Sequence, residues 1–136
     1  MPNSNEPNMN CMPKYVSHVL GKKWVLPILE ELSFERKGVR FNMLMEKLKF
    51  ITPRDLSMLL TQLVSIKLVS KANVKAGKKP TYKITESGDE FYGILKQIKE
   101  LSAKIKTPKG VKVDCYRTRC VECKYYALDY AEQTKS

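Results

Sequence analysis

Between positions 52 and 65 the hydrophobic residues recur at intervals of three and four, which is typical of a helix with one buried face. Thr52 is a favourable N-cap residue, Pro53 suits the first helical position, and Asp55 stands where it can complete the cap. The apolar side consists of Leu56, Leu59, Leu60, Leu63 and Val64, whereas the opposite side carries Arg54, Met58, Thr61 and Ser65, flanked by Asp55 and Gln62. One side of this helix is therefore available to a partner.

After this helix, the sequence predicts two strands joined by a basic turn. The first strand covers residues 68–75, the turn is AGKKP, and the second strand covers residues 81–85. A helix followed directly by such a hairpin is the second half of a winged helix-turn-helix. Lys75, Lys78 and Lys79 are expected at the tip of this wing, where lysines can neutralise DNA phosphates without reading base sequence.

Three shorter helices are predicted before it, over residues 13–20, 21–33 and 41–50, with a short strand at 39–41. The second of these helices contains Pro27, and we expect a kink there in preference to a helix start near Val25. The connection from the third helix to Thr52 is very short, as a helix-turn-helix requires. His18, the single histidine, is interpreted as structural.

A longer helix is predicted over residues 86–106, with Thr85 as its cap. Its apolar residues form a narrow seam close to the coiled-coil period, and we expect an identical helix from a second chain to cover it. The residues expected at this homodimer interface are Phe91, Leu95, Ile98, Leu101 and Ile105, with Ile94 as an alternative to Leu95.

These elements predict an α+β, mainly α, fold: a winged helix-turn-helix with a long C-terminal dimerisation helix. A length of 136 residues fits one domain, which we place at 13–106 with its dimerisation helix at about 86–106. Residues 1–12 are expected to be a flexible N-terminal arm, and residues 107–136 a basic tail that contains cysteines.

The charge of the chain favours a polyanionic partner. There are 25 Lys and Arg residues against 14 Asp and Glu, a formal net charge of +11. No apolar run approaches the roughly 20 residues that span a bilayer, and the N-terminus lacks the apolar core of a secretion signal. The sequence therefore predicts a cytoplasmic protein with double-stranded DNA, not a membrane, as its partner. The helical residues expected to contact DNA are Thr52, Arg54, Ser57, Met58, Thr61 and Gln62.

Two other functions are compatible with this pattern, namely a winged-helix module that binds an acidic protein and a non-specific, chromatin-like DNA-binding protein. An enzyme is not predicted, because the sequence has one histidine and shows neither a nucleophile–base pair nor a phosphate-binding loop.

The four cysteines are candidates for metal binding or thiol oxidation. Cys115, Cys120 and Cys123 form a C-x4-C-x2-C pattern, and Cys11 is the natural fourth ligand for a site with four thiolates. One zinc ion per subunit, an iron–sulfur cluster, a reversible disulfide and inert buried thiols are the alternatives. Neighbouring positive charge, such as that of Arg119, lowers the pKa of a thiol and so favours metal binding and oxidation alike.

Several short motifs also occur in a fixed order. They are Cys11, Gly21-Lys22-Lys23-Trp24, Arg40-Phe41, Ile51-Thr52 with Leu56, Leu68-Val69, and Tyr82-Lys83-Ile84-Thr85 with Gly88. In this order the chain resembles the HxlR-type winged helix-turn-helix transcriptional regulators over residues 11–101. The resemblance implies a dimeric DNA-binding regulator, often responsive to oxidants or electrophiles through the cysteine that Cys11 matches. Small archaeal winged-helix regulators are a second resemblance.

The chain departs from the HxlR pattern at several positions. Lys67 replaces the glycine of the G-L-V turn, and Leu59 stands where many members carry an arginine in the recognition helix. Pro27 and the cysteine tail are further departures. The DNA sequence preference of other members should therefore not be transferred, and Cys11 is expected to act together with the cysteines of the tail.

Overall fold

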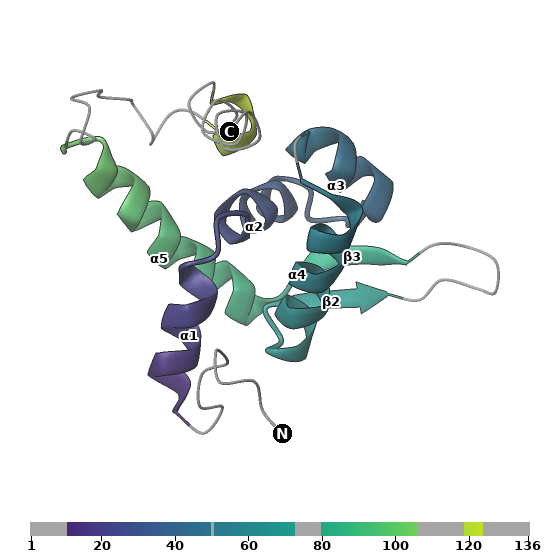
Figure 1. The fold of residues 1–136 in the computed structure, drawn as a ribbon, viewed down its shortest axis with the longest axis horizontal. Coiled ribbons are helices and arrows are strands. Elements are labelled where there is room, and N and C mark those ends of the chain that lie inside the picture. Colours follow the sequence, from purple (N-terminus) through teal and green to yellow (C-terminus); the bar gives the residue numbers. More distant parts are fainter. Residues whose placement is uncertain (1–10, 50, 73–79, 106–118, 124–136) are drawn as a thin grey trace, which may run out of the picture.

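The computed structural model describes residues 11–49, 51–72, 80–105 and 119–123. These ranges contain five α-helices, a small sheet and one short 3-10 turn, arranged as in Figure 1. The elements are α1 (Met12–Leu20), α2 (Val25–Phe34), β1 (Val39–Arg40), α3 (Phe41–Leu48), α4 (Pro53–Ser65), β2 (Val69–Ala72), β3 (Thr81–Ile84), α5 (Glu86–Ser102) and η1 (Cys120–Glu122). Their order confirms the predicted winged helix-turn-helix fold.

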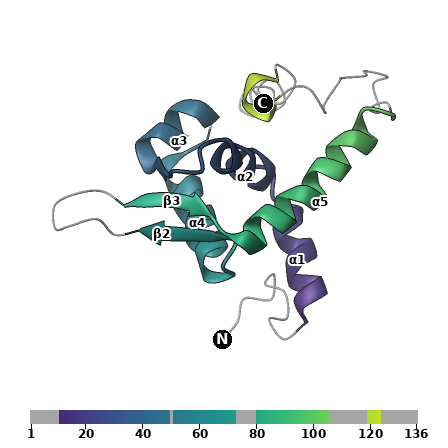
Figure 2. The same ribbon diagram turned by 180° about the vertical axis from the view of Figure 1, so that it is seen from behind.

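The wing is part of a three-stranded antiparallel sheet with the order β1-β3-β2. Val69 pairs with Ile84 at the base of the hairpin, and Val39 pairs with Tyr82 on the other side of β3. The hairpin extends away from the helices in both views of the ribbon (Figures 1 and 2). The strand predicted at 68–75 is thus observed at 69–72, and residues 73–79, which include Lys75, Lys78 and Lys79, lie outside the described residues.

Helix α2 lies at the centre of the hydrophobic core. Ile28, Leu29 and Leu32 are fully buried between the sheet, α5 and the helix-turn-helix. The expected kink at Pro27 is wrong, because α2 begins at Val25 and Pro27 is its third residue. In the first turn of a helix the backbone N–H groups have no intrahelical acceptor, so the N–H that proline lacks removes no ladder bond.

Helix α4 has the predicted cap and the predicted buried face. The Thr52 hydroxyl accepts a hydrogen bond of 3.1 Å from the backbone N–H of Asp55, which satisfies one of the free donors at the helix start. Leu56, Leu59, Leu60 and Leu63 are buried. This face alone fixes how α4 sits on the domain, so its opposite face is free to point outward.

The end of α4 is a Schellman turn with Lys67 in the left-handed region. The Leu68 N–H donates to the Leu63 carbonyl and the Lys67 N–H donates to the Val64 carbonyl, both at 3.0 Å. Lys67 has a φ of 65°. This is the position at which the HxlR pattern has glycine, and a side chain there is unfavourable because its Cβ crowds the backbone.

Replacing Lys67 with glycine should therefore stabilise the domain. We expect Lys67→Gly to raise the free energy of unfolding by about 0.5–1 kcal/mol, since relief of the strain exceeds the extra chain entropy of glycine. Lys71→Gly, at an exposed strand position with ordinary backbone, is the matched control and should lower stability. Urea denaturation of both variants measures the difference, and equal losses in the two would contradict this assignment.

Helix α5 contributes to the core as well as to the surface. Phe91, Tyr92 and Leu95 are buried in the core of their own chain. This corrects the expected dimer interface, because Phe91 and Leu95 are not available to a second chain. The exposed apolar side of α5 instead consists of Ile94, Ile98 and Leu101, followed by Ile105 just beyond the helix. Apolar residues on two sides of a helix also recur at spacings of three and four. The sequence pattern therefore did not distinguish the buried residues of α5 from the exposed ones.

Candidate nucleic-acid interface

The outward face of α4 presents a row of side chains that can form hydrogen bonds. Thr52, Arg54, Ser57 and Thr61 are exposed, and Gln62 is half-buried. Met58, the apolar member of the row, is 58% exposed. Ser57, Met58, Thr61 and Gln62 line one hollow along the helix, whereas Thr52 and Arg54 are exposed at its start. Polar side chains in a row on one exposed helix face suit the major groove of DNA, which an α-helix can enter.

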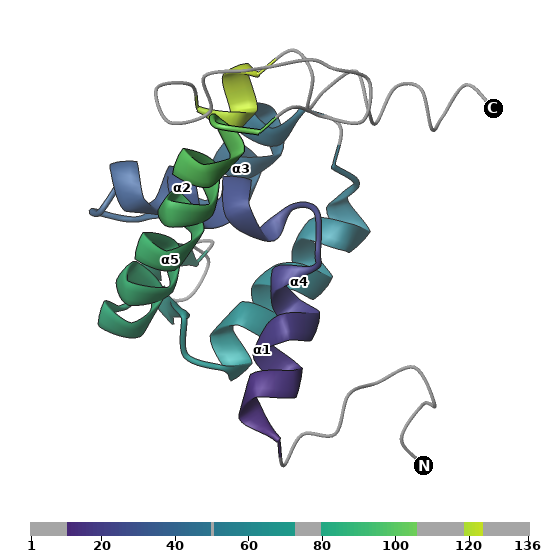
Figure 3. The same cartoon turned by 90° about the vertical axis from the view of Figure 1, so that its left-hand side faces the viewer.

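A hollow of about 690 Å³ runs along this face of α4. Its other wall is formed by α1 and the turn that leads into α2, and α1 lies beside α4 in Figure 3. The Gln62 amide donates to the Tyr15 hydroxyl at 3.4 Å and links the two walls. The lining residues are Tyr15, His18, Lys22, Lys23, Trp24, Asp55, Ser57, Met58, Leu59, Thr61, Gln62 and Ser65.

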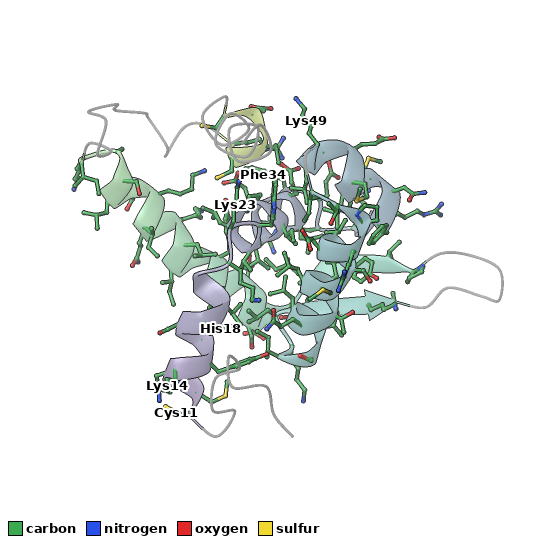
Figure 4. The ribbon with its side chains drawn as sticks, viewed as in Figure 1. Cys11, Lys14, His18, Lys23, Phe34 and Lys49 are labelled. Atoms are coloured by element: carbon green, nitrogen blue, oxygen red, sulfur yellow. The ribbon has the colours of Figure 1, made fainter. Side chains whose placement is uncertain are left out.

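The sequence reading missed the second wall of this hollow. Lys22 and Lys23 were noted only as part of a motif, and His18 was interpreted as structural, yet all three line the hollow opposite Thr61. Figure 4 shows His18 and Lys23 on the segments that form this wall. The available signal was a pair of lysines directly before an aromatic residue and a helix start. The Lys23 ammonium is buried and lies 5.6 Å from the centre of the Trp24 ring, so Lys22 is the member of the pair that a phosphate can reach.

The turn between α3 and α4 is compact and conformationally unusual. Lys49 ends α3 with a φ of 55° and a ψ of −65°, so the chain reverses within a few residues before Thr52 caps α4. Lys71 on β2 and Lys83 on β3 are exposed on the described part of the wing. The described surface therefore carries positive side chains on both sides of α4.

The described cysteines do not come together. Cys11 is exposed at the start of α1, whereas Cys120 and Cys123 are half-buried at η1, and none of the three is in a disulfide. Figure 4 shows Cys11 at the outer end of α1, on the opposite side of the molecule from η1. Cys115 lies outside the described residues. Within the parts of the chain that are described, no three His, Cys, Asp or Glu side chains group as ligands for a metal ion.

Two adjacent buried glutamates on α2 connect several elements. The Glu30 carboxylate accepts hydrogen bonds from Lys99 at 2.6 Å and Tyr92 at 3.0 Å, both on α5. Its other oxygen accepts from the backbone N–H of Cys120 at 2.8 Å. Burial and the nearby Glu30 carboxylate raise the pKa of the Tyr92 hydroxyl above its usual range, so it remains a proton donor.

Glu31 makes the corresponding contacts on the other side of α2. Its carboxylate lies 3.3 Å from the Lys47 ammonium on α3 and 3.7 Å from the Arg119 guanidinium. Neither glutamate was singled out in the sequence, because two glutamates in the middle of a helix normally indicate a solvated surface. Their burial shows that α2 joins the helix-turn-helix, α5 and the segment that contains Cys120.

A comparison with protein families shows which family the chain belongs to. A family model described as HxlR-like helix-turn-helix matches residues 19–109. The chain belongs to this family. The HxlR family comprises transcriptional regulators, so the sequence resemblance is confirmed and the fold serves DNA-binding regulation in this family.

Solved structures agree with the HxlR assignment. A possible HxlR family transcriptional factor from Thermoplasma volcanium GSS1 is 28% identical, with a TM-score of 0.53 over 63% of this chain and 80% of that one. The reduced form of the regulator YodB from B. subtilis is 23% identical, with a TM-score of 0.61 over 71% and 95%. Its diamide-treated form is 21% identical, with a TM-score of 0.60 over 74% and 100%.

The two YodB structures, at 21% and 23% identity, are evidence for the fold alone. No curated protein matched the chain. None of the helices in the described ranges is long and apolar enough to cross a membrane.

Proposed function

We propose that this protein is a sequence-specific, double-stranded DNA-binding transcriptional regulator that acts as a homodimer. The observation that carries the proposal is the outward face of α4, where a fixed helix presents Arg54, Ser57, Thr61 and Gln62 beside a hollow with a lysine-bearing wall. In this proposal α4 enters the major groove, while Lys22 contacts a flanking phosphate. The wing-tip lysines, Lys75, Lys78 and Lys79, are proposed to contact phosphates on the other flank.

The homodimer is proposed from the exposed apolar side of α5. Ile94, Ile98, Leu101 and Ile105 are each about half exposed. Four large aliphatic side chains in one row form the kind of apolar stripe that a second copy of the helix can cover. Two copies of α4 held in this way would read two half-sites of DNA.

Arg54→Ala tests the assignment of α4. We expect a loss of about 1–3 kcal/mol in binding to a preferred duplex, because arginine can donate two hydrogen bonds to one guanine. Fluorescence anisotropy over a series of salt concentrations measures this loss. Lys22→Ala should instead weaken all duplexes alike and reduce the salt dependence, since a phosphate contact carries no sequence information.

Lys96→Ala is the matched control, because it removes one exposed positive charge from α5 instead of α4. It should leave the affinity close to that of the unchanged protein. Equal effects of Arg54→Ala and Lys96→Ala would count against the docking of α4.

Absence of duplex binding even at low salt would favour the alternative in which the basic surface meets an acidic protein, whereas equal affinity for all duplexes would favour a chromatin-like role.

Ile98→Asp tests the homodimer. A carboxylate within an apolar interface loses hydration without a partner, so we expect the variant to sediment as a monomer at concentrations where the unchanged protein is a dimer. Gln97→Asp introduces the same charge at the neighbouring exposed position and should remain dimeric. Analytical ultracentrifugation distinguishes the two, and a dimer in both variants would place the interface elsewhere.

A further inference from the structure

A single tight turn joins Cys120 to Cys123. The Cys123 N–H donates to the Cys120 carbonyl at 3.2 Å, which closes a single 3-10 turn. In such a turn the two end Cα atoms lie within about 7 Å, and side chains three residues apart project on the same side. Both residues are partly exposed, and neither is in a disulfide.

This turn is built into the fold by contacts on either side of its first cysteine. The Cys120 N–H donates to Glu30, whose side chain is 2% exposed. The Arg119 guanidinium stacks 3.9 Å from the centre of the Phe34 ring, and Val121 packs against the core. Figure 4 shows Phe34 directly beside η1. A turn fixed at three points loses little conformational freedom when a ligand joins its two thiols.

Charged side chains of both signs lie beside the turn, since the Arg119 guanidinium is 3.7 Å from the Glu31 carboxylate and the Glu30 carboxylate accepts from the Cys120 N–H. Two thiolates carry two negative charges, and Arg119 directly precedes them. Thiolates are soft ligands, which select soft metal ions such as Cu(I). Structural zinc normally takes four ligands, and the described part of this site offers two, with Cys11 on the opposite side of the molecule.

We propose that Cys120 and Cys123 form a binding site for one soft metal ion, of the Cu(I) class, held by two thiolates. Binding releases one proton from each thiol and forms two metal–sulfur bonds, with no change in the oxidation state of either partner. The site is separate from the DNA-facing surface of α4, and the proposal does not depend on the function proposed above. The bond from Cys120 to Glu30 connects it to Tyr92 and Lys99 of α5.

Anaerobic titration of the reduced, full-length protein with Cu(I), in competition with a chromogenic Cu(I) chelator, tests the site. We expect one Cu(I) per chain. Cys120→Ser and Cys123→Ser should each weaken binding by about 100-fold or more, because each removes a direct ligand. Cys11→Ser is the matched control and should bind as the unchanged protein does.

The midpoint of thermal unfolding gives a second readout that does not rely on the chelator. One equivalent of Cu(I) should raise the midpoint of the unchanged protein and of Cys11→Ser, but not that of Cys123→Ser. The proposal is overturned if the unchanged protein binds no Cu(I), if Cys11→Ser loses binding, or if zinc binds tightly with all four thiols protected from alkylation.

Discussion

Gly88→Ala should lower the free energy of unfolding by about 3 kcal/mol or more, because the added methyl group has no space. A Cβ at this position would lie 2.0 Å from the Leu68 carbonyl oxygen and 2.8 Å from a side-chain carbon of Ile84. The first of these is backbone, which cannot rotate away. The Gly88 N–H also donates to the Thr85 hydroxyl at 3.0 Å, so any shift of the helix start disturbs the cap of α5.

Gly93→Ala is the control for this prediction. Gly93 is in the same helix, and a Cβ there would have no atom within 4 Å. Alanine should therefore stabilise α5 by up to about 1 kcal/mol through its higher helix propensity. Chemical denaturation followed by circular dichroism measures both variants. A small loss in Gly88→Ala would show that α5 does not pack against the carbonyl of Leu68 as closely as described.

Glu30→Ala should lower the free energy of unfolding by about 3–5 kcal/mol, the range for breaking a buried ion pair. The Lys99 ammonium, with a side chain only 8% exposed, would lose its carboxylate at 2.6 Å. The Tyr92 hydroxyl and the Cys120 N–H would lose the same acceptor. The loss comes from several buried donors at once, so it should exceed that of an isolated surface pair.

Glu35→Ala is the matched control, since its side chain is 56% exposed beside the same helix and lies 3.9 Å from Lys47. It should change stability by no more than about 0.5 kcal/mol. The double variant Glu30→Leu with Lys99→Met should recover the part of the loss that comes from the uncompensated Lys99 charge, while the Tyr92 hydroxyl and the Cys120 N–H still lose the Glu30 acceptor. If Glu30→Ala lowers the free energy of unfolding no more than Glu35→Ala does, the contacts of Glu30 with Lys99, Tyr92 and Cys120 do not stabilise the fold as described.

The helix-turn-helix and the wing could be predicted because local signals agree with tertiary packing. Thr52 and Pro53 mark the start of α4, the leucines that follow mark its buried side, and the hairpin has an ordinary turn composition. The αL conformation of Lys67 was not predicted, although the glycine that the HxlR pattern has there was an available signal. These features depend on residues within about one or two helical turns of each other.

The rest depends on contacts between distant segments. Glu30 and Glu31 look like a solvated pair in the sequence, and only the arrival of Lys99 and Lys47 from other helices makes their burial favourable. Periodicity similarly could not divide the apolar residues of α5 between the core and the outer surface, so Phe91 and Leu95 were assigned to the wrong side. The wall that Lys22 and Lys23 form opposite α4 also arises from packing.

Selection of binding sites from random double-stranded DNA, followed by sequencing, tests the central claim most directly. A homodimer that reads DNA with α4 should enrich an inverted repeat whose half-site centres lie about 10–10.5 base pairs apart, or a multiple of that spacing. Ile98→Asp should fail to enrich the paired repeat, and Arg54→Ala should lose preference at one position of each half-site. Recovery of no sequence above the starting pool, with folded protein, would contradict the account.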